Sequence, residues 1–180
     1  MTKIAVIVGS LRADSFNKKL ARNLEALAPE GTEFIYTDIS TLPLYSQEIE
    51  GEYPVAAQKL KDVILGADGV LVVTPEYNRS VPGVLKNAID WASRPTTENA
   101  FDSKPTGIVG ASMSPLGTAL AQAHLKTILI YLNVKLMGQP EVYLTGAHMV
   151  FDDDGVVVET AREHLKKYIN ALVAHVNASN

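Results

Sequence analysis

The sequence predicts an α/β protein built on one parallel β-sheet with helices on both of its faces. Strand-like and helix-like patterns alternate along the whole chain of 180 residues. Residues 4–8 and 70–73 are continuous apolar runs, which are typical of parallel strands buried on both faces. Each of these two runs ends in a loop rich in Gly, Ser or Pro, the residues that most often end regular structure.

The first half of the chain predicts two strands, two helices and a long loop. Residues 3–8 form the first strand, and in residues 17–28 three leucines recur at the spacing of one helical face. Residues 33–38 alternate apolar and polar side chains, which indicates a strand nearer an edge of the sheet. Residues 42–53 show no periodicity, so we expect a long loop, before residues 55–67 resume helical spacing.

The second half continues the alternation. Three more strands are predicted at residues 69–74, 106–111 and 140–144. Helices are predicted at residues 84–91, 116–132 and, over most of its length, 156–175. Internal repeats, low-complexity tracts and interdomain linkers are absent from the sequence, so residues 1–180 are expected to form a single domain.

Chain order limits the possible sheets, because parallel crossovers are right-handed. A flavodoxin-like strand order of 2-1-3-4-5, in a three-layer sandwich with a five-stranded parallel sheet, brings the loops after strands one, three and four together. Ligands in such sheets bind at the carboxyl ends of the strands, near the switch in strand order. We therefore expect the functional site at these three loops.

Composition excludes several classes of function. The net charge is -4 and no basic stretch is present, so neither a nucleic acid nor a membrane surface is an expected partner. The first apolar run is too short for a signal segment or a membrane span, which favours a cytoplasmic protein. The chain has no Cys, its His residues lack metal-ligand spacing, and no G-x-S-x-G motif is present. No metal site is expected.

The loop after the first strand, residues 9–17, has the chemistry of a phosphate site. Ser10 and Ser15 supply hydroxyl donors, and Arg12 supplies a full charge on a planar fork that suits phosphate oxygens. Asn17 adds an amide where a helix begins, and helix N-termini favour anions. The alternative is an ordinary turn in which Ser15 only caps the helix.

The loop after the third strand, residues 75–83, has the chemistry of a platform for a flat ring. Pro75 stiffens the loop, so that its backbone can present polar groups to the edge of a heterocycle. Tyr77 offers an aromatic surface and Asn78 a donor–acceptor pair, whereas Glu76 can also be a solvated or interface carboxylate. Together, the two loops suggest a site for flavin mononucleotide (FMN).

These loops, with the run Leu-Lys-Asn-Ala-Ile-Asp-Trp at residues 85–91, resemble the NADPH-dependent FMN reductase family, in the branch of soluble quinone, chromate and azo-dye reductases. The resemblance implies that the FMN phosphate is held by Ser10, Arg12, Ser15, Phe16 and Asn17. It implies that the isoalloxazine ring is lined by Pro75, Glu76, Tyr77 and Asn78, with a further contact from Ser112. Relatives often have a double glycine where this chain has Gly117-Thr118.

The resemblance also implies an activity. NADPH or NADH would give a hydride to bound FMN, and a quinone, chromate, azo compound or free flavin would then take the electrons in a ping-pong cycle. The flavin carries this chemistry, so no side chain is assigned as catalytic. Two alternatives stay open: a flavodoxin-type electron carrier that binds FMN without oxidising a nicotinamide directly, and a non-enzymatic domain that has lost the cofactor.

Relatives assemble as homodimers and often as homotetramers, so the resemblance implies self-association. The predicted helices 84–91 and 116–132 carry apolar residues beyond one face. These residues could form an interface or could belong to a thick core: Trp91, Ile128, Ile130, Tyr131 and Leu132.

Overall fold

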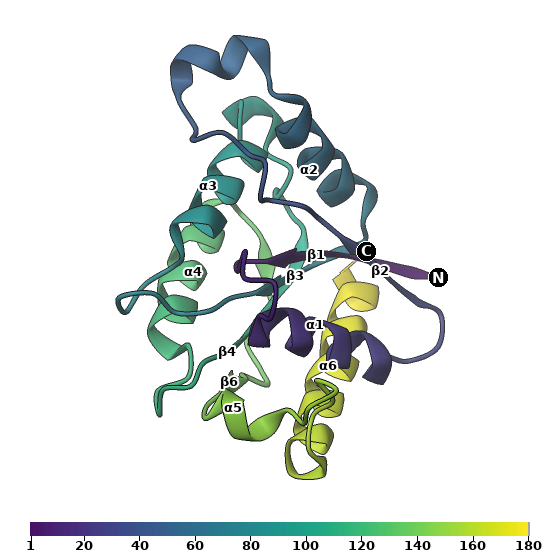
Figure 1. Cartoon of the computed structure of the whole chain (residues 1–180). Coiled ribbons are helices and arrows are strands. Elements are labelled where there is room, and N and C mark those ends of the chain that lie inside the picture. Colours follow the sequence, from purple (N-terminus) through teal and green to yellow (C-terminus); the bar gives the residue numbers. More distant parts are fainter. Residues whose placement is uncertain (180) are drawn as a thin grey trace.

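The structure, a computed structural model that describes residues 1–179, has helices on both faces of a parallel sheet (Figure 1). The strands are β1 (Thr2–Val8), β2 (Thr32–Tyr36), β3 (Gly69–Val73), β4 (Pro105–Ala111), β5 (Lys135–Leu136) and β6 (Tyr143–Leu144). The α-helices are α1 (Phe16–Leu27), α2 (Val55–Gly66), α3 (Gly83–Ala92), α4 (Ala119–Tyr131), α5 (Ala147–Val150) and α6 (Glu159–Ser179). Two short 3-10 helices are η1 (Gln47–Glu52) and η2 (Thr96–Glu98).

The strand order is β2-β1-β3-β4-β5, which confirms the predicted order and the flavodoxin-like fold. Every residue of β3 is buried, and so are residues 4–7 of β1, which explains why these two strands read as continuous apolar runs. Val73 is in register with Val8 on one side and with Val109 on the other. The carboxyl ends of β1, β3 and β4 therefore lie at one edge of the sheet.

The prediction of one fifth strand at 140–144 is wrong in detail, because the chain reaches the sheet in two short pieces. β5 pairs with the start of β4 at Pro105 and Thr106, and β6 pairs with its end at Gly110 and Ala111. Between the two pieces lies Pro140, which has no backbone N–H with which to continue a ladder. The helices predicted at 116–132 and 156–175 also begin later than expected, since α4 begins at Ala119 and α6 at Glu159, each after an irregular loop.

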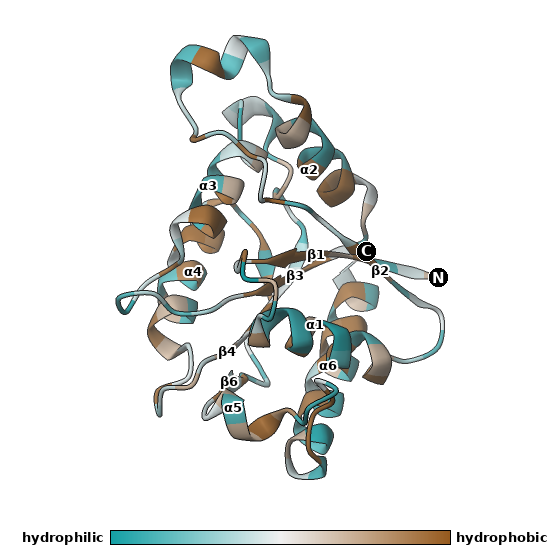
Figure 2. Ribbon diagram, viewed as in Figure 1, coloured by the Kyte–Doolittle hydropathy of each residue, from teal (hydrophilic) through white to brown (hydrophobic). Residues whose placement is uncertain are grey.

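Two separate cores lie on the two faces of the sheet. On one face α1 and α6 pack with Leu20, Leu24, Tyr168 and Leu172 against β1, β3 and β4. On the other face, the core is formed by α2, α3 and α4. In Figure 2 the central strands form the most continuous hydrophobic part of the ribbon, with polar residues on the outer surfaces of the helices.

Two side chains of α3, those of Asn87 and Trp91, fasten the long loop before α2. Asn87 donates its Nδ2 hydrogen to the Pro43 carbonyl at 2.9 Å, and its Oδ1 accepts from the Tyr45 N–H at 2.8 Å. Trp91 Nε1 donates to the same Pro43 carbonyl at 2.8 Å. Trp91 is fully buried, so its place is in the core and not at an interface; the same holds for Leu132.

Over residues 1–179, none of the helices combines the length and the apolar character that a bilayer-spanning segment needs.

Candidate functional site

The loops that follow β1, β3 and β4 enclose one cavity of about 340 Å³ at the carboxyl edge of the sheet. Nine of the ten predicted site residues line it, and Asn78 does not. The lining residues are Ser10, Arg12, Ser15, Phe16, Asn17, Pro75, Glu76, Tyr77, Ala111, Ser112, Met113 and Ser114. Ala111, Met113 and Ser114 were missed as individual residues, although their loop was expected to join the site.

The helix α1 begins at this cavity, and Ser15 marks its start. The Ser15 Oγ accepts a hydrogen bond from the Asn17 N–H at 3.2 Å, so Ser15 is both a cavity-lining residue and the helix cap. Ser10 and Ser15 are almost completely buried. The first turn of α1 therefore brings backbone N–H groups and the positive end of the helix dipole to this wall of the cavity.

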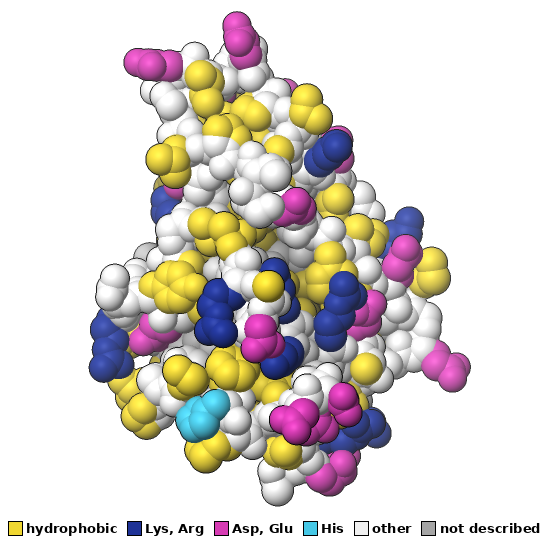
Figure 3. All heavy atoms as spheres, in the orientation of Figure 1, with side chains coloured by type: hydrophobic (Ala, Val, Ile, Leu, Met, Phe, Trp, Pro, Cys, Tyr) yellow, Lys and Arg dark blue, Asp and Glu magenta, His cyan; other side chains and the backbone are white. Residues whose placement is uncertain are grey.

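Arg12 adds a positive charge at the mouth of the cavity. Its guanidinium is exposed and donates to the Asp14 carbonyl at 3.1 Å. The Asp14 carboxylate pairs instead with Lys19 at 2.6 Å, and this hydrogen bond holds the pKa of Asp14 below its ordinary value. Lys and Arg side chains gather on this face over the loop after β1 and the start of α1 (Figure 3). The local charge therefore favours an anion.

Asn17 joins two walls of the cavity to each other. Its Nδ2 donates to the Ala111 carbonyl and its Oδ1 accepts from the Ala111 N–H, both at 2.9 Å. The side chain is thus committed to the end of β4. Contact between Asn17 and a phosphate stays a prediction. Because the side-chain amide is already bonded to Ala111, such a contact would use the backbone of Asn17.

The loop after β3 forms a tight hairpin. Tyr77 and Ser80 exchange two backbone hydrogen bonds, of 3.1 and 3.0 Å. Between them Asn78 and Arg79 both have positive φ, of 50° and 63°, the conformation of a type I′ turn. Tyr77 lines the cavity with 48% of its surface exposed, whereas Asn78 lies at the exposed tip of the turn.

Glu76 is not a solvated carboxylate. Its side chain is only 6% exposed. Its Oε2 accepts hydrogen bonds from the N–H groups of Leu120 and Ala121, both at 3.0 Å, at the start of α4. Sequence reasoning missed this role because the cap and the helix are separated by more than forty residues, and no local motif links them.

The third wall is the loop after β4, which is held by its own backbone. Ser112 donates its N–H to the Leu144 carbonyl at 2.9 Å and accepts at its own carbonyl from Ala147 at 3.1 Å. A Cβ atom added at Gly110 would lie 2.2 Å from the Thr74 carbonyl oxygen, so only glycine allows β3 and β4 to end this close together. This closeness of the ends of β3 and β4 brings Pro75 and Ser112 to the same cavity.

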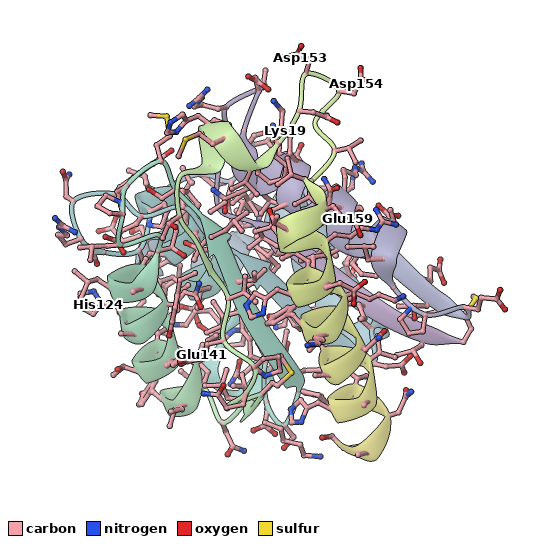
Figure 4. The ribbon with its side chains drawn as sticks, turned by 90° about the horizontal axis from the view of Figure 1, so that it is seen from below. Lys19, His124, Glu141, Asp153, Asp154 and Glu159 are labelled. Carbon is pink, nitrogen blue, oxygen red and sulfur yellow. The ribbon has the colours of Figure 1, made fainter. Side chains whose placement is uncertain are left out.

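No group of three or more His, Asp or Glu side chains within residues 1–179 is placed to hold a metal ion. Asp153 and Asp154 project outward from the loop before α6 (Figure 4).

The chemistry of the lining fits a phosphate ester joined to a flat heterocycle. Hydroxyls, a guanidinium and a helix N-terminus stand on one side, and a proline, a tyrosine and the Ser112 loop stand on the other. A site with this division of polar and flat surfaces can bind a flavin mononucleotide.

Comparison with known proteins agrees with this chemistry. The family model described as NADPH-dependent FMN reductase matches residues 2–149. The chain is 49% identical over 175 residues to a 2-hydroxy-1,4-benzoquinone reductase from Burkholderia sp, covering 97% of this chain and 96% of that one. It is 42% identical over 174 residues to a quinone reductase from Pseudomonas putida, covering 96% and 94%.

Among solved structures, the flavoenzyme NAD(P)H:(acceptor) oxidoreductase FerB from Paracoccus denitrificans superposes with a TM-score of 0.93 and 40% sequence identity. The match covers 99% of this chain and 98% of FerB.

Proposed function

The chain belongs to the NADPH-dependent FMN reductase family, and we propose that it uses FMN to pass electrons from a nicotinamide to a quinone. As a member of this family it is an NAD(P)H-dependent oxidoreductase whose cofactors are FMN and NAD(P)H. The single observation that carries the proposal is that three loops meet around one cavity. They are the phosphate loop after β1 (residues 9–17), the Tyr77 hairpin after β3 (residues 77–80) and the Ser112 loop after β4 (residues 112–118).

The residues of the cavity divide the work of holding FMN. Ser10, Ser15 and the first turn of α1 would bind the phosphate, with the charge of Arg12 beside them. Pro75, Tyr77 and Ser112 would border the ring. When bound, FMN supplies the hydride acceptor and the electron donor, so the protein's part is to bind, to orient and to donate hydrogen bonds.

A quinone is the proposed acceptor because the relatives with the highest identity reported above are named for quinone reduction. The rim of the cavity supports this choice. Tyr77 and Met113 are both about half exposed there, and they offer apolar surface to a flat, aromatic molecule.

An anaerobic titration of FMN-loaded protein with NADPH tests the proposal. Loss of the flavin absorbance at stoichiometric NADPH, followed by its return on addition of 1,4-benzoquinone, is the expected result. Flavin that stays oxidised with both NADPH and NADH would instead support an electron carrier. A protein that does not take up FMN would contradict both functions.

We further propose that the chain forms a homodimer or homotetramer. At the end of α4, Ile130 and Tyr131 are consecutive and are 62% and 83% exposed, so they offer apolar surface to a second copy of the chain. Sedimentation of the wild type should give a dimer or tetramer, and Tyr131→Ser should shift the distribution towards smaller species. A monomeric wild type would contradict the proposal.

Dependence on NAD(P)H supports a cytoplasmic location.

A further inference from the structure

The Tyr77 hairpin, residues 77–80, is fastened to α4 on both of its flanks. On the entering side, Glu76 caps the start of α4 through the N–H groups of Leu120 and Ala121. On the leaving side, the Ser80 Oγ lies 2.9 Å from Nδ1 of His124. Figure 4 shows His124 on the outer side of α4. In the sequence, His124 comes one helical turn after Leu120. The hairpin therefore has two side-chain contacts with a single rigid helix.

The two hydrogen bonds between the Glu76 carboxylate and the start of α4 are stronger than hydrogen bonds between neutral groups. A carboxylate that accepts two backbone N–H bonds at a helix N-terminus forms charge-assisted hydrogen bonds and also meets the positive end of the dipole. The Glu76 side chain is only 6% exposed, although the bond from Leu120 lies at the surface and the bond from Ala121 is partly buried. The contact of Glu76 Oε1 with Arg79 is looser, at 3.9 Å to a guanidinium that is mostly exposed, so α4 is the main partner of Glu76.

The His124 contact does not depend on one protonation state. A serine hydroxyl donates to a neutral imidazole nitrogen and accepts from a protonated one. His124 is exposed, so its replacement leaves the cores intact. This makes it the cleaner probe of the two contacts.

The hairpin needs such anchors because its own bonds are few. Two backbone hydrogen bonds and a two-residue turn do not hold a ribbon rigidly in water, and the tip of the turn is exposed. Hydride transfer, however, demands that the reacting groups be held close to one geometry. A hairpin that borders the ring must therefore take its rigidity from its neighbours.

We propose that Glu76 and His124 are positioning residues, which fix the Tyr77 hairpin against α4 and thereby set the orientation of the flavin ring for reduction. This inference rests on the proposed function, because it assigns to these residues the placement of the ring rather than contact with it. The FMN phosphate is bound by a different wall of the cavity, so loss of either anchor should disturb the ring more than the retention of FMN.

The test uses the FMN-loaded protein with Glu76→Ala, Glu76→Gln, His124→Ala and His124→Asn. Glutamine and asparagine keep an acceptor near the original atom, while alanine removes it. Matched controls are Glu163→Ala and His164→Ala, which replace exposed residues of α6. Three quantities are measured: the rate constant of flavin reduction at saturating NADPH, the Kd for FMN, and the visible circular dichroism of the bound flavin.

Glu76→Ala should slow flavin reduction by about tenfold or more, and His124→Ala by a smaller factor, with an altered flavin dichroism in both. The Kd for FMN should change by less than about threefold, because the phosphate contacts remain. Glu76→Gln and His124→Asn should restore most of the rate, and the two controls should match the wild type.

Unchanged reduction rates and unchanged flavin dichroism in both alanine variants would overturn the proposal, even if their melting temperatures fall. The dichroism separates this outcome from failure of the proposed function. If NADPH does not reduce the wild type, the proposed function fails, and the flavin dichroism of the alanine variants still reports whether the ring has lost its orientation.

Discussion

Asn17 and Ala111 exchange two hydrogen bonds of 2.9 Å across 94 residues of sequence. The bonds tie the first turn of α1 to the last residue of β4, and so they join the phosphate wall of the cavity to the Ser112 wall. Both residues are buried. The same contact serves stability and the shape of the site, because neither loop can shift without the other.

Asn17→Ala should lower the free energy of unfolding by about 2–4 kcal/mol, because it removes two buried hydrogen bonds and leaves two backbone groups without partners. Urea denaturation at a fixed FMN concentration measures the change. Asn23→Ala is a useful comparison, because Asn23 also bonds backbone groups on another segment but lies away from the cavity. FMN affinity should fall in the first variant and not in the second. Equal FMN affinity in both would contradict the joining role of Asn17.

Arg12→Ala should weaken FMN binding by about 1.5–3 kcal/mol, the usual contribution of a hydrogen bond to a charged group. Stability without FMN should be unaffected, because the guanidinium is exposed and bonds only a neighbouring carbonyl. Fluorescence titration measures the affinity, and riboflavin, which lacks the phosphate, is the matched control ligand. The variant and the wild type should bind riboflavin equally. An undiminished affinity for FMN would remove Arg12 from the phosphate site.

The sequence was sufficient to predict the strand order from its local patterns, and nine of the ten residues assigned through the family resemblance line the cavity. Buried parallel strands read as apolar runs, and the loops after them must meet at one edge of the sheet. The roles within the site were less accessible. Asn17 and Glu76 were predicted as cofactor contacts, yet their side chains bond distant backbone groups at Ala111 and on α4. No local pattern encodes a partner that is more than forty residues away.

The fifth strand shows a second limit of sequence reasoning. Its two pieces pair with opposite ends of β4 and have only two residues each. Such pieces are too short to show a periodicity, so their place is decided by the neighbouring strand and not by their own residues. The apolar character of Val142 and Leu144 reflects burial in the core, and only part of that segment belongs to the sheet.

The stability of the chain should depend on Glu141 at acidic pH. Glu141 lies in the segment before β6 (Figure 4). It pairs with Lys126 of α4, and this hydrogen bond, helped by one with Tyr143, holds the pKa of Glu141 below its ordinary 4.5. A depressed pKa stabilises the fold above the pKa of the unfolded chain, and the contribution is lost as the pH falls through the folded value. Glu141→Gln should therefore lower the melting temperature near pH 7 but not near pH 2.

Scanning calorimetry across that range, with Glu163→Gln on the exposed face of α6 as the control, checks the pH dependence of this pair. A melting-temperature difference between Glu141→Gln and the wild type that is constant from pH 7 to pH 2 would show that the carboxylate charge is not the cause.

The turn of the Tyr77 hairpin should be stabilised by glycine at its second position. Asn78 and Arg79 both have positive φ. Asparagine tolerates this conformation, whereas in arginine the Cβ atom is sterically crowded. Type I′ turns therefore favour the pair Asn-Gly. Arg79→Gly should raise the free energy of unfolding by about 0.5–1 kcal/mol. Glycine removes the steric cost of the left-handed conformation, but its greater flexibility in the unfolded chain offsets part of that gain. Arg79→Ala removes the same side chain and its loose contact with Glu76 but keeps the strain, so it isolates the backbone effect. Chemical denaturation of the two variants side by side gives the answer: glycine should be the more stable, and equal stabilities would mean that the hairpin holds its left-handed turn without strain.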